Sequence, residues 1–282
     1  MSKHVINGLA LRVFRASSNA RSRSVLVNGA LGVKQSFYAH YARALAAQGL
    51  DVVTYDYSGV GESRAAGWQG ATLRDWYERD ARAALEFAAS EFGDRPVTLV
   101  GHSIGAQFLH LAPDSAARGA VDALFTVSSM NNEFAHQRAD SLQTRIFFRA
   151  IVPAACHLCD AFPAKRLGLF EDVPGGVMLE WLSWMRDGAP FEPIAGAAPA
   201  AVASLSFADD EYGRESAVRD FHDRVYGDQN VTYLRPDLRG VGHHGFFKPR
   251  HEALWRDTLP RVAPGDDAPA WTGDWEGRAP PP

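Results

Sequence analysis

A serine lies at the centre of the five residues Gly101-His102-Ser103-Ile104-Gly105. An apolar run at 97–100 precedes it, and a helix-forming stretch at 106–111 follows it. This order predicts a buried strand that turns sharply into a helix, with the serine at the turn. Such a turn, a nucleophile elbow, presents the serine hydroxyl at the edge of a sheet, and its glycines let helix and strand approach closely. Ser103 is therefore a candidate nucleophile.

A serine hydroxyl becomes a useful nucleophile only when a base removes its proton, so a histidine and an orienting carboxylate are expected later in the chain. His243 and His244 follow the glycine-containing residues 240–242 after a predicted strand, and we favour His243. Asp209 and Asp210 end another predicted strand. We assign Asp210 to the histidine and expect Asp209 to cap the next helix or to face solvent. Asp209 and His244 stay open as alternates.

Attack on a carbonyl makes its oxygen negative, and two backbone N–H groups commonly stabilise that charge. One comes from the residue after the nucleophile and the other from the loop after an early strand. Ile104 and Ala30 occupy these positions, Ala30 within the glycine-containing residues 28–32. They are the predicted oxyanion-hole donors.

The surrounding elements alternate between strands and helices after an opening hairpin. Asn7-Gly8 predicts a tight turn between two strands over 5–14, and strand–helix units follow up to about residue 127. This alternation predicts an α/β protein with a mostly parallel sheet covered by helices on both faces. We expect a core from 1–128 and 204–263, an inserted helical cap at 129–203, and a loose tail at 264–282.

Bulk properties exclude several classes of protein. The 282 residues carry a net charge of -4, and we see no basic cluster interleaved with aromatic residues, so nucleic acid is not an expected partner. No apolar stretch approaches the ~20 residues of a membrane span, and the first residues lack the apolar core of a secretory signal, which predicts a cytoplasmic protein.

Two further motifs predict no metal and no cofactor. Cys156 and Cys159 form a lone C-x-x-C without the second ligand pair of a structural zinc site. Gly59-Val60-Gly61 lacks the third glycine of a dinucleotide loop, because Arg64 stands there. It is expected to be a structural turn, held by local hydrogen bonds of Asp56 and Ser63.

Several of these segments together resemble the α/β-hydrolase superfamily over about residues 5–262. They are Asn28-Gly29, Asp56-Tyr57-Ser58-Gly59-Val60-Gly61-Glu62-Ser63, Gly101-His102-Ser103-Ile104-Gly105, Asp209-Asp210 and Gly242-His243. More narrowly, the chain is similar to serine-aminopeptidase-like predicted bacterial hydrolases, in which a Gly-Val cap segment with paired tryptophans and a Gly-His-x-Gly-Phe-Phe motif recur. Here these are Gly176-Val177, Trp181, Trp184 and Gly242-His243-His244-Gly245-Phe246-Phe247.

The resemblance implies the α/β-hydrolase fold and a serine hydrolase that cleaves a small-molecule ester or thioester of a mostly apolar acyl group. Acyl transfer by the same residues is the alternative, and a non-catalytic ligand-binding protein of this fold is a third reading. Two residues depart from the family pattern. Asn28 stands where many relatives have histidine, which bears on the packing of the loop, and Ser58 replaces a frequent arginine, which is expected to remove an ion pair.

Overall fold

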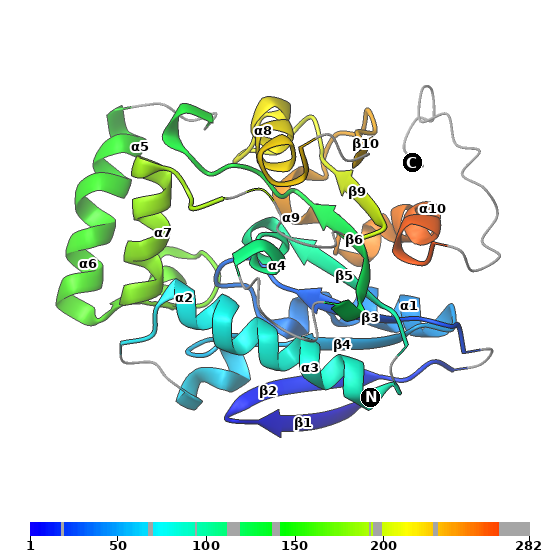
Figure 1. Cartoon of the computed structure of the whole chain (residues 1–282). Coiled ribbons are helices and arrows are strands. Elements are labelled where there is room, and N and C mark those ends of the chain that lie inside the picture. Colours follow the sequence, from blue (N-terminus) through cyan, green and yellow to red (C-terminus); the bar gives the residue numbers. More distant parts are fainter. Residues whose placement is uncertain are drawn as a thin grey trace.

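The computed structural model describes residues 1–17, 20–66, 70–93, 95–111, 119–136, 142–191, 193, 199–227 and 231–264. Among these residues, eight strands form one sheet in the order β1-β2-β4-β3-β5-β6-β9-β10 (Figure 1). They are β1 (Ser2–Ile6), β2 (Leu9–Phe14), β3 (Ser24–Asn28), β4 (Asp51–Tyr55), β5 (Val97–His102), β6 (Val121–Val127), β9 (Ala201–Leu205) and β10 (Val231–Leu234). β1 and β4 each pair antiparallel with β2, and the remaining pairs are parallel, which confirms the predicted mostly parallel sheet.

The opening hairpin follows from its turn residues. Asn7 and Gly8 have φ angles of 52° and 84°, and β1 pairs with β2 directly across them. A two-residue turn with positive φ at both positions matches the twist of the flanking strands, and Asn-Gly is the sequence that adopts it most readily. The predicted hairpin is confirmed.

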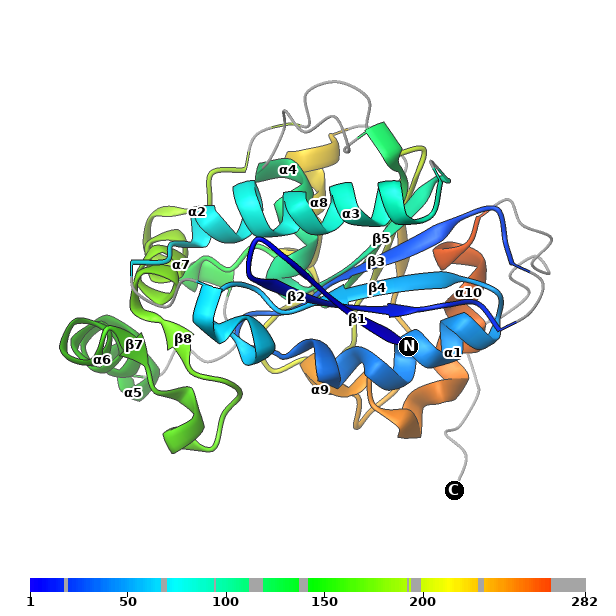
Figure 2. The same cartoon turned by 90° about the horizontal axis from the view of Figure 1, so that it is seen from below.

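Helices cover both faces of the sheet (Figures 1 and 2). One face packs against α2 (Leu73–Asp75), α3 (Arg82–Glu91), α4 (Phe108–Leu111) and α8 (Glu215–Tyr226), and the other against α1 (Ala39–Ala47) and α10 (Glu252–Val262). Every residue of β3 and β4 is buried as a result. A strand covered on both sides must be apolar at successive positions, which explains the continuous Val/Leu runs in the sequence.

The strand order changes direction at β3. The chain passes from β3 to β4 on one side of β3 and returns to β5 on the other side. The connections that leave the carboxyl ends of β3 and β5 therefore run in opposite directions, and ligands commonly bind at such a switch point in sheets of this type. The predicted nucleophile and the predicted oxyanion loop follow these two strands.

Between β6 and β9 the chain leaves the sheet and forms a helical segment, which we call the cap (described residues 134–136 and 142–191). It contains α5 (Leu142–Ile146), α6 (Val152–Cys159), β7 (Ala161–Phe162), β8 (Val173–Pro174) and α7 (Gly175–Asp187), and α5 and α6 project beyond the sheet (Figure 2). β9 begins at Ala201, so the boundary expected after residue 203 falls within a strand. The tail expected from residue 264 lies outside the described residues after Pro264.

In the described part of the chain, no helix combines the length and apolar character needed to cross a bilayer. Cys156 and Cys159 both lie in α6 as free thiols, the first buried and the second exposed. Gly176, in the first turn of α7, lies so close to the core that a Cβ there would be 2.5 Å from the carbonyl oxygen of Ala71.

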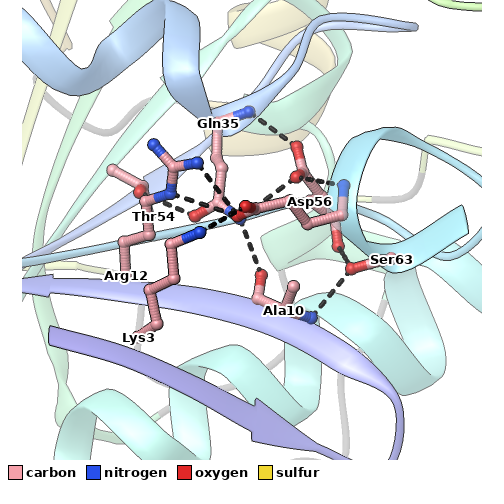
Figure 3. Close-up of polar contacts among 8 residues, drawn as sticks. Lys3, Ala10, Arg12, Gln35, Thr54, Asp56 and Ser63 are labelled. Carbon is pink, nitrogen blue, oxygen red and sulfur yellow. Dashed lines mark hydrogen bonds and ion pairs between the residues drawn. The ribbon is translucent and has the colours of Figure 1, made fainter.

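The turn that follows β4 is fixed by polar contacts of its own residues (Figure 3). The Asp56 carboxylate accepts hydrogen bonds from the backbone N–H groups of Gln35 (2.7 Å) and Glu62 (2.9 Å), and the Ser63 hydroxyl donates to the Asp56 carbonyl (2.7 Å). Gly61 has a φ of 52°, and a Cβ there would lie 2.5 Å from the Asp56 carboxylate. The expected role of Asp56 and Ser63 in this turn is confirmed.

The turn after β5 depends on two close backbone contacts. A Cβ on Gly101 would lie 2.3 Å from the Cα of Ala106. A Cβ on Gly105 would lie 2.5 Å from the carbonyl oxygens of both Asn28 and Gly29. Gly101 thus lets the helix fold back on its own strand, and Gly105 lets that helix contact the loop after β3.

We therefore expect Gly105→Ala to lower the free energy of unfolding by about 1–3 kcal/mol, because backbone atoms must shift to accept the methyl group. Gly119→Ala is the matched control, since a Cβ at Gly119 meets nothing within 4 Å. Urea unfolding of the two variants measures the difference. Equal stability of G105A and G119A would contradict the packing described here.

Candidate active site

Ser103 occupies a sharp turn at the carboxyl end of β5. β5 ends at His102, and the short helix η4 (Ser103–Ala106) begins immediately after it. The φ of Ser103 is 54°, a left-handed backbone conformation that non-glycine residues seldom adopt and that clusters at functional sites. The side chain is half-buried, and its hydroxyl makes no hydrogen bond to any of the described residues. The strand, turn and helix predicted from sequence are all present.

The structure brings His243 and Asp210 together. His243 lies in the short helix α9 (Gly242–Gly245), and Asp210 follows β9. The His243 Nδ1 lies 2.9 Å from one Asp210 carboxylate oxygen and 3.1 Å from the other. Burial alone would raise the pKa of Asp210, but its contacts with His243 and the backbone N–H of Tyr212 lower it below the ordinary value. An ionised carboxylate only accepts hydrogen bonds, so Nδ1 carries a proton, and in the neutral tautomer that this contact favours Nε2 keeps its lone pair.

Asp209, the alternate acid, does neither of the two things expected of it. Its carboxylate accepts hydrogen bonds from the backbone N–H groups of Gly240 (2.5 Å), Val241 (3.1 Å) and Gly242 (3.1 Å). Glu211 extends this arrangement, because its carboxylate accepts the N–H of His243 at 3.1 Å. Sequence reasoning missed Glu211, although three consecutive acids after a strand were visible. Asp209 and Glu211 thus hold the backbone of residues 240–243, which we call the histidine loop.

His102, the residue before Ser103, connects the turn to the histidine loop. Its Nε2 lies 3.0 Å from the carbonyl oxygen of His243, and the centroids of the two rings are 5.3 Å apart. Ser103 is therefore adjacent in the chain to a residue that contacts His243. Burial, together with the neighbouring His243 and His244, holds the pKa of His102 well below its ordinary value, so its ring is neutral.

His244, the alternate histidine, lies among aromatic rings rather than against a carboxylate. Its ring centroid is 4.4 Å from that of Phe170 in the cap and 6.2 Å from that of Tyr212. Burial lowers the pKa of His244 to about 3, with a further contribution from His243. Its Nδ1 is buried without a hydrogen-bond partner among the described residues. Neutral His244 and these aromatic rings give His243 an apolar surrounding on this side.

The two predicted oxyanion donors differ in whether their backbone N–H groups already have a hydrogen-bond partner. Ile104 is the second residue of η4, where a backbone N–H has no partner within the helix. The N–H of Ala30 is not free, because it donates to the Tyr38 hydroxyl at 2.8 Å. The structure thus gives the Ala30 N–H a partner, and the assignment of Ala30 to the oxyanion hole stays a prediction. The sequence does not indicate this contact, because it forms only when the helix η1 (Gln35–Tyr38) places the Tyr38 hydroxyl against the loop.

The loop after β3 contains a tight turn over residues 30–33, and the N–H group of interest in it is that of Leu31. The Val33 N–H bonds the Ala30 carbonyl at 3.1 Å, and Gly32, the third residue of this turn, has a φ of 69°. Leu31 does not have a positive φ, so the turn is of type II. The N–H of Leu31 has no hydrogen-bond partner within the described residues.

Cap residues lie directly against this turn. The Glu171 N–H donates to the Gly32 carbonyl at 2.9 Å, and the buried Glu171 carboxylate pairs with Lys34 (2.9 Å) and Lys165 (2.6 Å). Burial would raise the pKa of Glu171, but the two lysines lower it below the ordinary value. Lys34 comes from the loop after β3 and Lys165 from the cap, so a single ionised carboxylate joins the cap to the predicted oxyanion loop.

The two departures from the family pattern have structural replacements. The Asn28 side chain accepts a hydrogen bond from the Tyr55 hydroxyl (2.9 Å) and donates to the Gly105 carbonyl (3.1 Å), which ties the loop to the elbow. Beside Ser58, the buried Asp80 carboxylate receives the Nε of Arg79 at 3.0 Å. An arginine adjacent to Asp80 in the chain thus forms an ion pair beside Ser58.

Comparisons with known proteins agree with this architecture. The model of the alpha/beta hydrolase fold family matches residues 25–150. No curated protein matches the sequence. Three solved structures with the same fold are a soluble variant of monoglyceride lipase from Saccharomyces cerevisiae (TM-score 0.69, 13% identity, 93% of this chain and 94% of that chain), a monoacylglycerol lipase from Paleococcus ferrophilus (0.60, 15%, 93% and 99%) and an esterase from Thermogutta terrifontis (0.59, 14%, 90% and 94%).

The family match covers β3 to the start of the cap, and the structural likeness extends over nearly the whole chain. The mostly parallel sheet, the helices on both faces and the serine turn after β5 are the shared features of that fold. The chain has the α/β-hydrolase fold.

Proposed function

We propose that this protein is a serine hydrolase that cleaves an ester or thioester of a mostly apolar acyl group through an acyl-enzyme on Ser103. The observation that carries the proposal is the contact between the His243 imidazole and the ionised Asp210 carboxylate. His243 also lies next to the serine turn, because its carbonyl oxygen contacts His102, the residue before Ser103. With its proton on Nδ1, His243 offers an unprotonated Nε2, the form that a general base requires. The left-handed backbone of Ser103 supports its role as nucleophile.

In the proposed reaction, the Nε2 of His243 takes the Ser103 proton as the hydroxyl oxygen attacks the acyl carbonyl. The imidazolium that forms is stabilised by Asp210 and then protonates the leaving alcohol or thiol, which departs as the acyl-enzyme forms. Water, deprotonated by His243, attacks the acyl-enzyme in the second half of the reaction. The acid leaves, and Ser103 recovers its proton. Ser103, His243 and Asp210 are the proposed catalytic residues.

The charge on the attacked oxygen requires two hydrogen-bond donors. Ile104, which follows the nucleophile, is the first proposed donor. For the second we propose Leu31 instead of Ala30, because the N–H of Ala30 is bonded to Tyr38 while that of Leu31 is free among the described residues. If Ala30 served instead, its N–H would have to exchange the Tyr38 hydroxyl for the substrate oxygen.

An apolar acyl group fits the side chains around the histidines. Phe170 of the cap contacts His244, and Tyr212 contacts His243 with ring centroids 4.9 Å apart. Aromatic rings next to an uncharged His244 favour an apolar group over a charged one, since a charged group would lose its hydration there without a partner. The lipase and esterase neighbours act on esters by name, which supports the same substrate class for this chain.

A fluorophosphonate probe tests the nucleophile. We expect the probe to label the wild-type protein on Ser103, as located by peptide mass spectrometry, because an activated serine attacks phosphorus as it attacks a carbonyl. Ser103→Ala removes the attacking oxygen and should abolish the labelling. Folded wild-type protein that stays unlabelled would favour a binding protein of this fold over an enzyme.

Substitutions of the two adjacent aspartates should affect different properties, catalysis for Asp210 and stability for Asp209. Asp210→Asn is expected to lower kcat by about 10⁴-fold, since an amide no longer holds the imidazole in the required tautomer. Asp209→Asn should instead lower the unfolding free energy by about 1–3 kcal/mol, because it weakens the hydrogen bonds to three backbone N–H groups. Steady-state kinetics with p-nitrophenyl butyrate and urea unfolding measure both effects. A larger loss of kcat in D209N than in D210N would overturn the assignment.

Leu31→Pro tests the second oxyanion donor. Proline removes the N–H of residue 31 and suits this position of a type II turn, so the turn should be kept. We expect kcat to fall about 10²- to 10³-fold, the usual effect of losing one such donor. Leu31→Ala keeps the N–H and is the control. Equal kcat values in L31P and L31A would return the role to Ala30.

A further inference from the structure

We propose that His102 and Tyr38 are positioning residues that act as one hydrogen-bonded unit, which fixes the serine turn, the histidine loop and the oxyanion loop relative to one another. Three contacts define the unit. The Ala30 N–H lies 2.8 Å from the Tyr38 hydroxyl, which lies 2.9 Å from the His102 Nδ1, and the His102 Nε2 lies 3.0 Å from the His243 carbonyl. The inference rests on the proposed function for the roles of the three loops.

The donor and the acceptor of each hydrogen bond can be assigned by starting from the His243 carbonyl. A carbonyl oxygen only accepts, so the His102 Nε2 must carry a proton to bond the His243 carbonyl. A neutral ring then has a lone pair on Nδ1, which accepts from the Tyr38 hydroxyl. The hydroxyl oxygen in turn accepts from the Ala30 N–H. Every member therefore has one possible arrangement, and reversing any bond would leave two donors or two acceptors facing each other.

Burial keeps both side chains in the neutral forms that this arrangement needs. Tyr38 is 1% exposed and His102 is fully buried. Burial raises the pKa of Tyr38 well above its usual value and lowers that of His102 well below, so neither ring ionises near neutral pH. Phe247 packs against both rings, at centroid distances of 4.8 Å from Tyr38 and 4.9 Å from His102. This packing limits the rotation of both rings, so they keep the hydrogen-bond partners described.

The three loops that the unit joins come from separate parts of the chain. His102 precedes the proposed nucleophile, the carbonyl belongs to the proposed base, and Ala30 begins the turn that holds the proposed oxyanion donor. A displacement of about 1 Å between such groups can lower a rate about 10²-fold. A side chain that fixes three loops at once can therefore affect the reaction without contacting the substrate.

Tyr38→Phe removes one hydroxyl from the unit and keeps the aromatic packing. We expect its rate of fluorophosphonate labelling to fall at least about tenfold, and kcat for p-nitrophenyl butyrate to fall similarly with KM nearly unchanged. Tyr41→Phe is the matched control, because the Tyr41 hydroxyl is equally buried on the adjacent helix α1 and has no hydrogen-bond partner among the described residues. Labelling of Y38F at the Y41F rate would overturn the proposal. Wild-type protein that is not labelled at all would overturn the proposed function instead.

Variants of His102 separate positioning from general stability. His102→Gln keeps an N–H donor near the Nε2 position, whereas His102→Leu has none for the His243 carbonyl. We expect kcat to fall in the order wild type, H102Q, H102L, with similar unfolding midpoints for the two variants. Equal kcat in H102Q and H102L would contradict a role for this donor.

The tautomer can be observed without any activity and in the wild-type protein. Long-range ¹H–¹⁵N correlation spectra of the histidine side chains, with H102Q used to assign the missing signals, should show His102 protonated at Nε2 alone between about pH 5 and 8, the range in which free histidine titrates. Protonation at Nδ1, or titration of His102 within this range, would overturn the proposal even if H102L fails to fold.

Discussion

The geometry of the whole site depends on the left-handed backbone at Ser103. A φ of 54° at a serine costs about 1–3 kcal/mol and persists only where the surroundings leave no alternative. Gly101 and Gly105 provide those surroundings, because the strand, its helix and the loop after β3 meet at distances that no side chain permits. The same contacts bring the loop after β3 against the turn. Strain at one residue is thus the condition for bringing the proposed nucleophile and the proposed oxyanion loop together.

The histidine loop is held by charge in a different way. Three consecutive acids follow β9, and each contacts a different part of the loop: Asp209 the backbone N–H groups of 240–242, Asp210 the imidazole of His243, and Glu211 the N–H of His243. Hydrogen bonds from N–H groups to carboxylates are about twice as strong as neutral ones. Asp210, the proposed orienting acid, therefore need not also hold the backbone of this loop, and its carboxylate contacts the imidazole.

Local patterns in the sequence were enough to predict the sheet, the hairpin at Asn7-Gly8 and the turn at Ser103, because each depends on neighbouring residues. Contacts between distant segments were not predictable in the same way. Nothing near Ala30 shows that the Tyr38 hydroxyl takes its N–H, and nothing near Ser58 shows that Arg79 pairs with Asp80. The roles of Asp209 and Asp210 depend on which carboxylate the strand aims at the imidazole. Adjacent residues of one type cannot be told apart by pattern.

The most direct test of the account is the capture of the acyl-enzyme. Wild-type protein mixed with p-nitrophenyl butyrate and quenched in acid within the first turnover should gain the mass of one butyryl group, and peptide mapping should place that group on Ser103. A burst of p-nitrophenol equal to the enzyme concentration should accompany it. Turnover of the ester with the label on another residue, or with no covalent species under conditions that slow its hydrolysis, would contradict the mechanism.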